Sequence, residues 1–277
     1  MAPEISVVVP LFNEAENVSP LVRQILQAFD SGERSVEVLL VDDCSTDSTW
    51  GRIAEEASRD PRVRGLRHPA NRGQSAALWT GFQNSRGEII ATLDGDQQND
   101  PADLPRMLAL LSACDMVCGA RTNRMDTFVR RVSSRIARWA RRAALRSQFT
   151  DTGCNLRVFK REVLQALMPF NGIHRFMPIL AQAGGAIVKE VPVSHRPRVA
   201  GVSKYGIWNR LGRGVCDLVM VGLYTRRQLK LLRQPSVSST KPSAGSARPP
   251  ELEATASEPG APRAPGRPDS RRPGDGV

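Results

Sequence analysis

The sequence predicts an α/β protein whose core is a mostly parallel β-sheet flanked by helices. Continuous runs of apolar, β-branched residues recur along the first half of the chain, and stretches with helical periodicity separate them. A continuous apolar run is typical of a strand that is covered on both faces, as the strands of parallel sheets are. Strands that alternate with helices at this spacing imply parallel pairing through right-handed crossovers.

Five strands are expected in the first 120 residues, and a helix follows each of the first three. The second of these helices is preceded by Ser45-Thr46-Asp47, whose side-chain oxygens can cap its first turn. The expected strands cover residues 5–10, 36–41, 62–66, 89–93 and 116–119, and the three helices end near Phe29, Ser58 and Gln83.

A strongly basic segment follows, with nine arginines and one acid between Arg121 and Arg146. Residues 128–144 place apolar side chains, Trp139 among them, on one helical face and arginines on the opposite face. Such a helix is typical of one that lies on an anionic membrane surface, where each arginine contributes about 1 kcal/mol. A solvated helix packed on the domain and a nucleic-acid patch are the alternatives, although no recognisable nucleic-acid-binding motif accompanies the charge.

The elements beyond residue 150 are fewer. Residues 151–159 are expected to turn into a short strand, a helix is expected at 161–168, and another strand at 187–193. The basic loop 196–206 carries Arg and Lys beside Gly and Ser, so it can close over phosphates, or it can be a solvated surface loop.

The last part of the chain changes composition twice. A second amphipathic helix is expected within residues 207–233, where it can contact a membrane surface, the core or a partner subunit. Residues 234–277 are rich in Pro, Ser, Ala, Gly and Arg, and we expect them to be disordered because they cannot bury enough apolar area. The main folded domain is therefore expected at residues 1–206.

The composition excludes several classes of protein. The five cysteines form no Cys-x-x-Cys pair, and with the three histidines they make no zinc pattern. The N-terminus leads directly into a strand, so no secretory signal is expected, and the longest apolar run, 218–224, is shorter than the roughly 20 residues that span a bilayer. We therefore expect reduced, mostly buried thiols in a cytoplasmic protein.

Acids or amides stand at the ends of three expected strands. Ligands of open α/β sheets bind beyond the carboxyl ends of the strands. The first turn lacks Gly-x-Gly-x-x-Gly and the chain has no Gly-Lys-Ser/Thr loop, which argues against a dehydrogenase-type dinucleotide fold and a P-loop ATPase. A nucleotide held partly through a metal ion is expected instead, near Asn13 and Glu14, Asp42 and Asp43, and Asp94 and Asp96.

The segment Asp94-Gly95-Asp96 carries the sharpest of these signals. Two carboxylates this close repel each other unless a cation lies between them, and Gly95 lets a ligand approach the backbone. Oxygens from Asp94, Asp96 and Gln98 would suit Mg²⁺ or Mn²⁺, with waters and a diphosphate completing the coordination. The alternative is an ordinary turn.

From about Ile5 to about Tyr224 the chain resembles the family 2 glycosyltransferases, and more narrowly the dolichyl- and polyprenyl-phosphate sugar transferases. The resemblance implies a GT-A fold, with a Rossmann-like sheet, and places the catalytic domain at residues 1–206. Five separated motifs carry it, in this order: Val-Val-Val-Pro-Leu-Phe-Asn-Glu, Val-Asp-Asp-Cys-Ser-Thr-Asp-Ser-Thr, Asn-Arg-Gly, Asp-Gly-Asp-Gln-Gln-Asn-Asp-Pro and Arg-Val-Ala-Gly-Val-Ser-Lys-Tyr.

The resemblance also implies a role for individual residues. The donor site is implied for Pro10, Phe12, Glu14, Asp42, Asp94, Gly95 and Asp96, and the divalent ion for Asp94, Asp96 and Gln98. The acceptor phosphate is implied to face Arg121, Arg130, Ser134 and Ser203, with Arg131 as a substitute for Arg130. Arg198 and Lys204 are implied to close on the phosphates, and Asp94, Asp96, Arg130, Arg198 and Lys204 form the implied catalytic set.

The implied reaction is inverting transfer of a hexose, mannose or glucose, from a UDP- or GDP-sugar to a polyprenyl phosphate. It would take place at the cytoplasmic face of the membrane, with Mg²⁺ or Mn²⁺ as cofactor and peripheral attachment to an anionic surface. Many relatives continue into transmembrane helices, whereas a polar tail follows here. A polysaccharide or protein acceptor is the main alternative, and a basic nucleic-acid-binding protein is a remote one. A homo-oligomer formed through residues 207–233 is also open.

Overall fold

The computed structural model describes residues 3–30, 32, 34–121, 142, 145, 147–196, 208–230 and 232. Its central feature is a seven-stranded sheet in the order β3-β2-β1-β4-β6-β5-β7. The strands are β1 (Ile5–Leu11), β2 (Val36–Asp42), β3 (Val63–Arg67), β4 (Ile89–Thr92), β5 (Met116–Arg121), β6 (Arg157–Lys160) and β7 (Val188–Val193). The α-helices are α1 (Ala15–Phe29), α2 (Thr49–Arg59), α3 (Gln74–Asn84), α4 (Leu104–Ala109), α6 (Met177–Ala183) and α7 (Trp208–Arg227).

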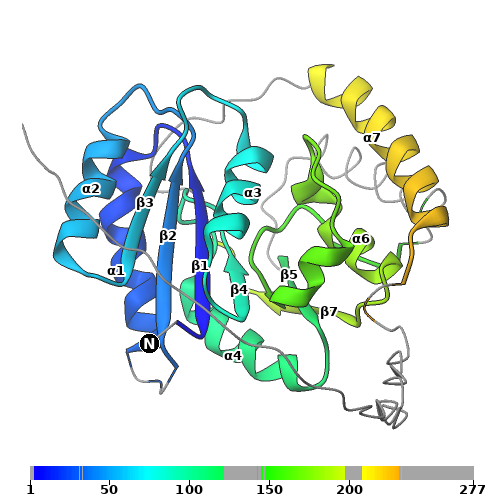
Figure 1. Ribbon diagram of the computed structural model, residues 1–277, viewed down its shortest axis with the longest axis horizontal. Helices are drawn as coiled ribbons and strands as arrows, with labels where there is room; N and C mark the ends of the chain where they lie inside the picture. The colour runs from blue at the N-terminus through cyan, green and yellow to red at the C-terminus, as the bar shows by residue number, and fades with distance from the viewer. Residues whose placement is uncertain are drawn as a thin grey trace, which may run out of the picture. The chain divides into compact units, whose positions relative to one another are not determined.

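The sheet has a hydrophobic core on each face. Helices α1 and α2 lie on one side of strands β1 to β3 and α3 lies on the other (Figure 1). The strand residues alternate between the faces: Val7 and Val9 pack in the cluster with α1, whereas Val8 packs with α3, α6 and α7. Each face excludes water from a fully buried strand, which explains why these strands are mostly apolar. Their buried polar residues are paired: Ser6 Oγ donates to Glu37 Oε1 at 2.6 Å.

Pairing is parallel except at β6. Strands β1, β2, β3 and β4 pair in parallel, as do β5 and β7, whereas β6 runs antiparallel to both β4 and β5. The prediction of a mostly parallel sheet is therefore confirmed. The strand expected at the end of residues 151–159 is β6, which runs opposite to the other strands. Because β6 is reversed, its amino end lies at the edge where β4 has its carboxyl end.

One expected helix differs in detail. Residues 161–166 form 3₁₀ turns (η3, Arg161–Ala166) where an α-helix was expected. The segment ends with an i→i+3 bond from the Leu167 N–H to the carbonyl oxygen of Leu164, and Pro169 disfavours a helical conformation of Met168, so the helix does not continue. Helix α3 begins at Gln74, directly after the turn at residues 71–73, as expected.

Other features of the described residues bear on the expectations. All five cysteines are free thiols, and Cys114, Cys118 and Cys154 are buried. In the part of the chain that the structure describes, we find no helix long and apolar enough to cross a membrane. Residues 234–277, the tail expected to be disordered, lie outside the described residues, as does nearly all of the predicted basic helix at 128–144.

Candidate functional site

The candidate site lies where β1, β2 and β4 have their carboxyl ends. Three non-glycine residues with positive φ stand in the loops after these strands: Asn13 at 52°, Cys44 at 61° and Gln97 at 58°. The left-handed region costs energy for residues with a side chain, and such residues cluster at functional sites. The strained loops thus coincide with the edge where the acids are found.

The loops after β1 and β2 are joined by hydrogen bonds. The Asn13 N–H donates to Ser45 Oγ at 2.9 Å, and the Thr46 N–H donates to Asn13 Oδ1 at 2.8 Å. The Glu14 N–H donates to Thr49 Oγ1 at 2.9 Å, while the Glu14 carboxylate accepts from Asn17 Nδ2 at 2.6 Å. The two loops therefore form one rigid wall.

The acids at the end of β2 both support the loops. Asp42 is completely buried, accepts from the Ser45 N–H at 3.1 Å through Oδ1, and forms an ion pair with Arg67 Nε at 3.1 Å through Oδ2. The neighbouring Asp43 accepts from the backbone N–H groups of Arg72 at 2.9 Å and Gly73 at 2.6 Å. Asp43 thereby fixes the turn that leads into α3, a role that the sequence did not assign.

A hollow of about 370 Å³ lies beside these acids, lined by Cys44, Arg67, His68 and Pro69. Its wall is braced, because His68 Nδ1 lies 2.7 Å from Asp43 Oδ1 and its Nε2 lies 2.9 Å from Thr80 Oγ1. Pro10 and Phe12, two residues assigned to the donor site, are half-buried at the end of β1.

Asp94 and Asp96 follow β4 and are held close together. Asp94 Oδ1 accepts from Gln74 Nε2 at 2.7 Å and from Asn155 Nδ2 at 2.8 Å. Asp96 is 8% exposed, and its Oδ1 accepts from the Gln98 N–H at 3.2 Å. Burial, followed by the negative charge of Asp96, raises the pKa of Asp94 to about 6. The site therefore disfavours two ionised carboxylates unless positive charge is added.

The donor set at this edge fits a hard divalent cation. Among the described residues we find no cluster of three or more His, Cys, Asp or Glu side chains able to hold a metal ion. The carboxylate ligands that the described site offers a cation are therefore those of Asp94 and Asp96. Mg²⁺ is commonly bound by one or two carboxylates, with waters and substrate phosphates as its other ligands. Gln98 is half-buried beside them, and its Nε2 lies 3.5 Å from the carbonyl oxygen of Arg196.

Gly95 is required by a close approach. A Cβ at this position would lie 2.4 Å from Leu11 Cδ2 and 3.2 Å from the Pro10 carbonyl oxygen. The left-handed residue of the loop is Gln97, whose Nε2 donates to Asn17 Oδ1 at 2.7 Å. The absence of a side chain at Gly95 thus lets the Asp94–Asp96 loop pack directly on the end of β1.

Arg121 reaches the site from the end of β5. Its Nε and Nη2 donate to the carboxylate of Asp151 at 2.6 and 2.8 Å, a bidentate pair that fixes the guanidinium. Arg157 lies deeper and is 1% exposed. The positive charges of Arg157 and Arg121 favour the ionised form of Asp94 and so partly offset the rise in its pKa. Positive charge therefore supports the acids from within the protein.

Sequence reasoning missed Gln74, Asn155, Asp151 and Arg157. Gln74 follows the Asn-Arg-Gly motif directly and Asn155 precedes β6, but only the antiparallel register brings residue 155 opposite residue 94. The remaining predicted acceptor and catalytic residues lie outside the described residues, so their roles stay predictions: Arg130, Arg131, Ser134, Arg198, Ser203 and Lys204.

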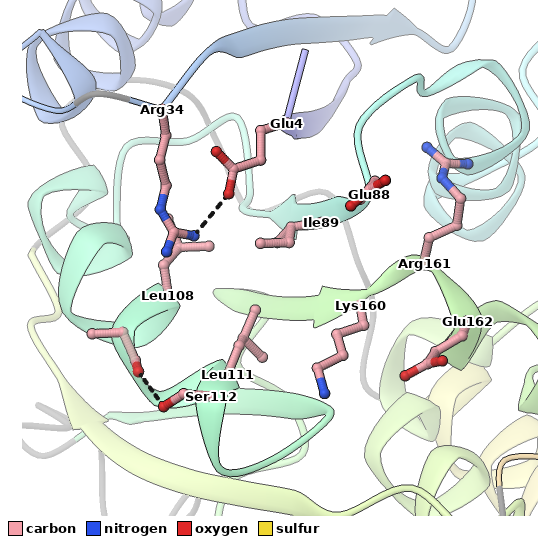
Figure 2. Close-up of a pocket in the computed structure, with 11 residues that line it drawn as sticks. Glu4, Arg34, Glu88, Ile89, Leu108, Leu111, Ser112, Lys160, Arg161 and Glu162 are labelled. Atoms are coloured by element: carbon pink, nitrogen blue, oxygen red, sulfur yellow. Dashed lines mark hydrogen bonds and ion pairs between the residues drawn. The ribbon is translucent and has the colours of Figure 1, made fainter. Parts of the chain in front are cut away.

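A larger hollow, of about 530 Å³, lies at the opposite edge of the sheet (Figure 2). Glu4 and Glu88, which precede β1 and β4, line it together with Lys160 at the end of the reversed β6. An ion pair between Arg34 Nη1 and Glu4 Oε1 at 3.3 Å crosses its wall. None of the predicted site residues lines this hollow, because the carboxyl ends of the parallel strands face the other way.

Comparisons with known proteins agree with this architecture. The model of the family described as Glycosyl transferase family 2 matches residues 6–168. Dodecaprenyl-phosphate galacturonate synthase of Rhizobium johnstonii is 36% identical over 231 residues, which cover 80% of this chain and 68% of that protein. Undecaprenyl-phosphate 4-deoxy-4-formamido-L-arabinose transferase of Edwardsiella ictaluri is 35% identical over 206 residues, which cover 73% of this chain and 63% of that protein.

A solved structure shares the fold at low sequence identity. Glucosyl-3-phosphoglycerate synthase from Mycobacterium tuberculosis, in complex with Mn²⁺, UDP and phosphoglyceric acid, aligns with a TM-score of 0.60 and 21% identity. The alignment covers 82% of this chain and 79% of that one. This likeness concerns the fold: a mostly parallel sheet between helices.

Proposed function

Because this chain belongs to glycosyltransferase family 2, we propose that it transfers a sugar from a nucleotide-sugar donor to a polyprenyl phosphate, with inversion. Its fold is the GT-A type that the sequence predicted. Two relatives that are named for dodecaprenyl- and undecaprenyl-phosphate support this class of acceptor. Their names concern galacturonate and a formamido-arabinose, so the support does not extend to mannose or glucose.

The observation that carries the proposal is the pair Asp94 and Asp96 at the carboxyl end of β4. Burial and mutual repulsion disfavour both charges at once, and a divalent cation relieves that cost. Asp94, Asp96 and the side-chain oxygen of Gln98 would hold Mg²⁺ or Mn²⁺. When bound, the ion supplies positive charge that stabilises the departing nucleoside diphosphate.

The donor nucleotide is proposed to lie along the joined loops after β1 and β2. Pro10, Phe12 and Glu14 would line the base and ribose, and Gly95 would let the diphosphate approach the backbone. Asp42 would support the donor site indirectly, because its carboxylate is fully buried and accepts a hydrogen bond from the Ser45 N–H in the loop after β2. The hollow beside Cys44 and His68, at the end of β2, gives space for a base of either UDP or GDP.

The acceptor requires positioning more than it requires a general base. A phosphate monoester is largely dianionic at pH 7, so its oxygen is already nucleophilic. That oxygen would attack the anomeric carbon as the bond from this carbon to the diphosphate oxygen breaks. Arg121 would face the acceptor phosphate, together with Arg130 or Arg131, Ser134 and Ser203, while Arg198 and Lys204 would neutralise charge on the leaving group.

Attachment at the cytoplasmic face of the membrane is proposed to be peripheral, and helix α7 supports contact with a membrane surface. Its inner face packs in the core through Val221, which is fully buried. On the outside Val219 is 57% and Leu223 61% exposed, and the helix ends in the exposed pair Arg226 and Arg227. Exposed apolar side chains beside cations fit an anionic leaflet. Flotation with anionic vesicles tests this, since an enzyme for a soluble acceptor would stay in the aqueous fraction.

The transfer reaction is tested by comparing Asp96→Asn with Asp30→Asn. Both substitutions replace a carboxylate by an amide, but Asp30 lies on the surface in an ion pair with Arg62. With polyprenyl phosphate and Mg²⁺ or Mn²⁺, a screen of UDP-glucose, GDP-mannose, UDP-galacturonate and UDP-4-deoxy-4-formamido-L-arabinose should find one donor that Asp30→Asn uses and Asp96→Asn does not. Equal turnover by the two variants would refute the metal assignment.

The acceptor assignment needs a separate variant. Arg130→Ala is expected to weaken use of polyprenyl phosphate while leaving donor affinity unchanged. An equal loss of donor affinity would move Arg130 out of the acceptor site. Transfer to a polysaccharide or protein, with none to polyprenyl phosphate, would favour the alternative acceptor.

A further inference from the structure

Two amide side chains from distant parts of the chain hold the carboxylate of Asp94. Gln74 is the first residue of α3, and Asn155 stands two residues before β6. Both donate to the same oxygen, Oδ1, at 2.7 and 2.8 Å. Their convergence fixes the rotation of the carboxylate and directs its second oxygen away from both amides.

Asn155 is anchored by its backbone as well as by its side chain. The β4–β6 ladder ends with the pair Thr92 and Arg157, and two residues further toward the site the hydrogen bond from Asn155 Nδ2 to Asp94 Oδ1 joins the two chain segments. Thr92 Oγ1 donates to the Asn155 carbonyl oxygen at 2.6 Å. The position of Asn155 is therefore set by the sheet, and its side chain is presented to the site from a rigid strand end.

The side-chain oxygen of Asn155 is buried without a donor. Asn155 is 6% exposed, and its Oδ1 accepts no hydrogen bond within the described part of the chain. The amide cannot be reversed to help, because its oxygen would then face the carboxylate oxygen of Asp94. A buried acceptor without a partner costs about 1–3 kcal/mol. This unpartnered acceptor lies beside the proposed cation site, where a bound ligand can supply the missing donor.

We propose that Asn155 binds the donor complex directly, with its Oδ1 accepting a hydrogen bond from an O–H group while its Nδ2 holds Asp94. The O–H group is a hydroxyl of the transferred sugar or a water molecule on the cation. Gln74 has only the second of these roles and is a positioning residue. This inference rests on the proposed function, because it places the donor complex at Asp94 and Asp96.

The matched pair Asn155→Leu and Gln74→Met separates the two roles. Each variant keeps the approximate volume of the side chain and removes one hydrogen bond to Asp94, but only Asn155→Leu also removes the buried acceptor. Asn84→Ala, which removes an exposed amide at the far end of α3, is the control for the loss of an amide elsewhere. Affinities for UDP and GDP with Mn²⁺, each alone and as its glucose or mannose conjugate, are measured by titration calorimetry.

The two sources of the O–H group give different results. If it is a sugar hydroxyl, Asn155→Leu binds the nucleotide sugar about tenfold more weakly than Gln74→Met does, with equal affinities for the bare nucleotide. If it is a cation-bound water, the same tenfold difference is already present with the bare nucleotide. Indistinguishable affinities of Asn155→Leu and Gln74→Met for both ligands would overturn the inference.

Failure of the proposed function gives a separate result. Wild-type protein that binds neither nucleotide with Mn²⁺ would refute the donor site at this edge, and the inference with it. Binding by wild type, with no difference between the variants, would refute only the role of Asn155. Should Asn155→Leu not fold, Asn155→Ala serves in its place, because it is small and lacks both the amide N–H group that reaches Asp94 and the acceptor oxygen.

Discussion

His174 gives the fold a pH dependence that can be worked out from its surroundings. It belongs to the 3₁₀ turn η4 (Ile173–Arg175), and its Nδ1 lies 2.8 Å from Ser75 Oγ. That hydroxyl accepts from the Gly172 N–H at 2.9 Å, so its own hydrogen is available for Nδ1 of a neutral imidazole. Burial, then the charges of Arg175 and Arg157, lowers the pKa of His174 to about 3.

The sign and size of the effect follow from the two pKa values. An unfolded histidine titrates near 6.5, so below that pH the unfolded chain binds a proton that the folded protein refuses. The unfolded state is then favoured, and stability falls as the pH falls from about 6.5 toward 3. At pH 5 the shift corresponds to about 2 kcal/mol, and the full shift to about 5 kcal/mol. These are upper values, because the imidazole is not completely enclosed.

Urea unfolding of wild type and His174→Asn at pH 8 and pH 5 measures this contribution. Asparagine carries no titratable group, and its side-chain oxygen can accept from Ser75 roughly where Nδ1 does. All other titrating groups are common to the two proteins, so they cancel in the difference between them. We expect wild type to lose about 2 kcal/mol more than His174→Asn between pH 8 and pH 5. Parallel losses would show that His174 is protonated in the folded protein or is solvated.

Three further substitutions have expected outcomes. Gly95→Ala should lower the free energy of unfolding by about 1–3 kcal/mol, because the added Cβ meets Leu11 at 2.4 Å, whereas Gly51→Ala in α2 meets nothing within 4 Å and should be neutral or stabilising in the same thermal melts. Asp43→Asn should cost about 1–3 kcal/mol in urea unfolding, since it exchanges a carboxylate that accepts two backbone N–H groups for an amide. Hydrogen bonds to the Glu37 carboxylate outweigh the effect of its burial and lower its pKa. Wild type should therefore be more stable than Glu37→Gln above about pH 4.3, and this advantage should be lost as the pH falls through the pKa of folded Glu37. A stability difference that is unchanged at pH 3 would contradict this.

The fold could be predicted from the sequence wherever a local pattern determined it. Strands β1 and β2 are mostly apolar because both faces are covered, and short runs rich in β-branched residues, such as residues 36–41, are typical of strands. The direction of β6 could not be predicted in this way. Arg157–Lys160 is four residues long, and its antiparallel pairing with β4 and β5 depends on contacts distant in sequence. Helix α6 was missed for a similar reason: seven residues give too short a periodic pattern.

The site divides along the same line. Asp94 and Asp96 could be found because two acids around a glycine after a strand form a local pattern. Asn155 could not, because its part in the site depends on the reversed strand that places it opposite Asp94. Gln74 stood beside a recognised motif, but its contact spans 20 residues and needs the start of α3 in place. Reactive residues that form a local sequence pattern can be predicted from the sequence, whereas the residues that orient them can be identified only from tertiary contacts.

The balance of forces on Asp94 shows why those orienting groups matter. Burial and Asp96 both favour its neutral form, whereas the hydrogen bond from Asn155 and the charges of Arg157 and Arg121 favour its ionised form. The opposing effects leave the pKa of Asp94 raised to about 6, which is still below 7, so most of the carboxyl is ionised at pH 7. Without the burial, the acids would be solvated and would attract a cation weakly; without the amide and arginines, Asp94 would be protonated more often and would lose its charge. Asn155 therefore contributes to the site even before its own oxygen meets a ligand.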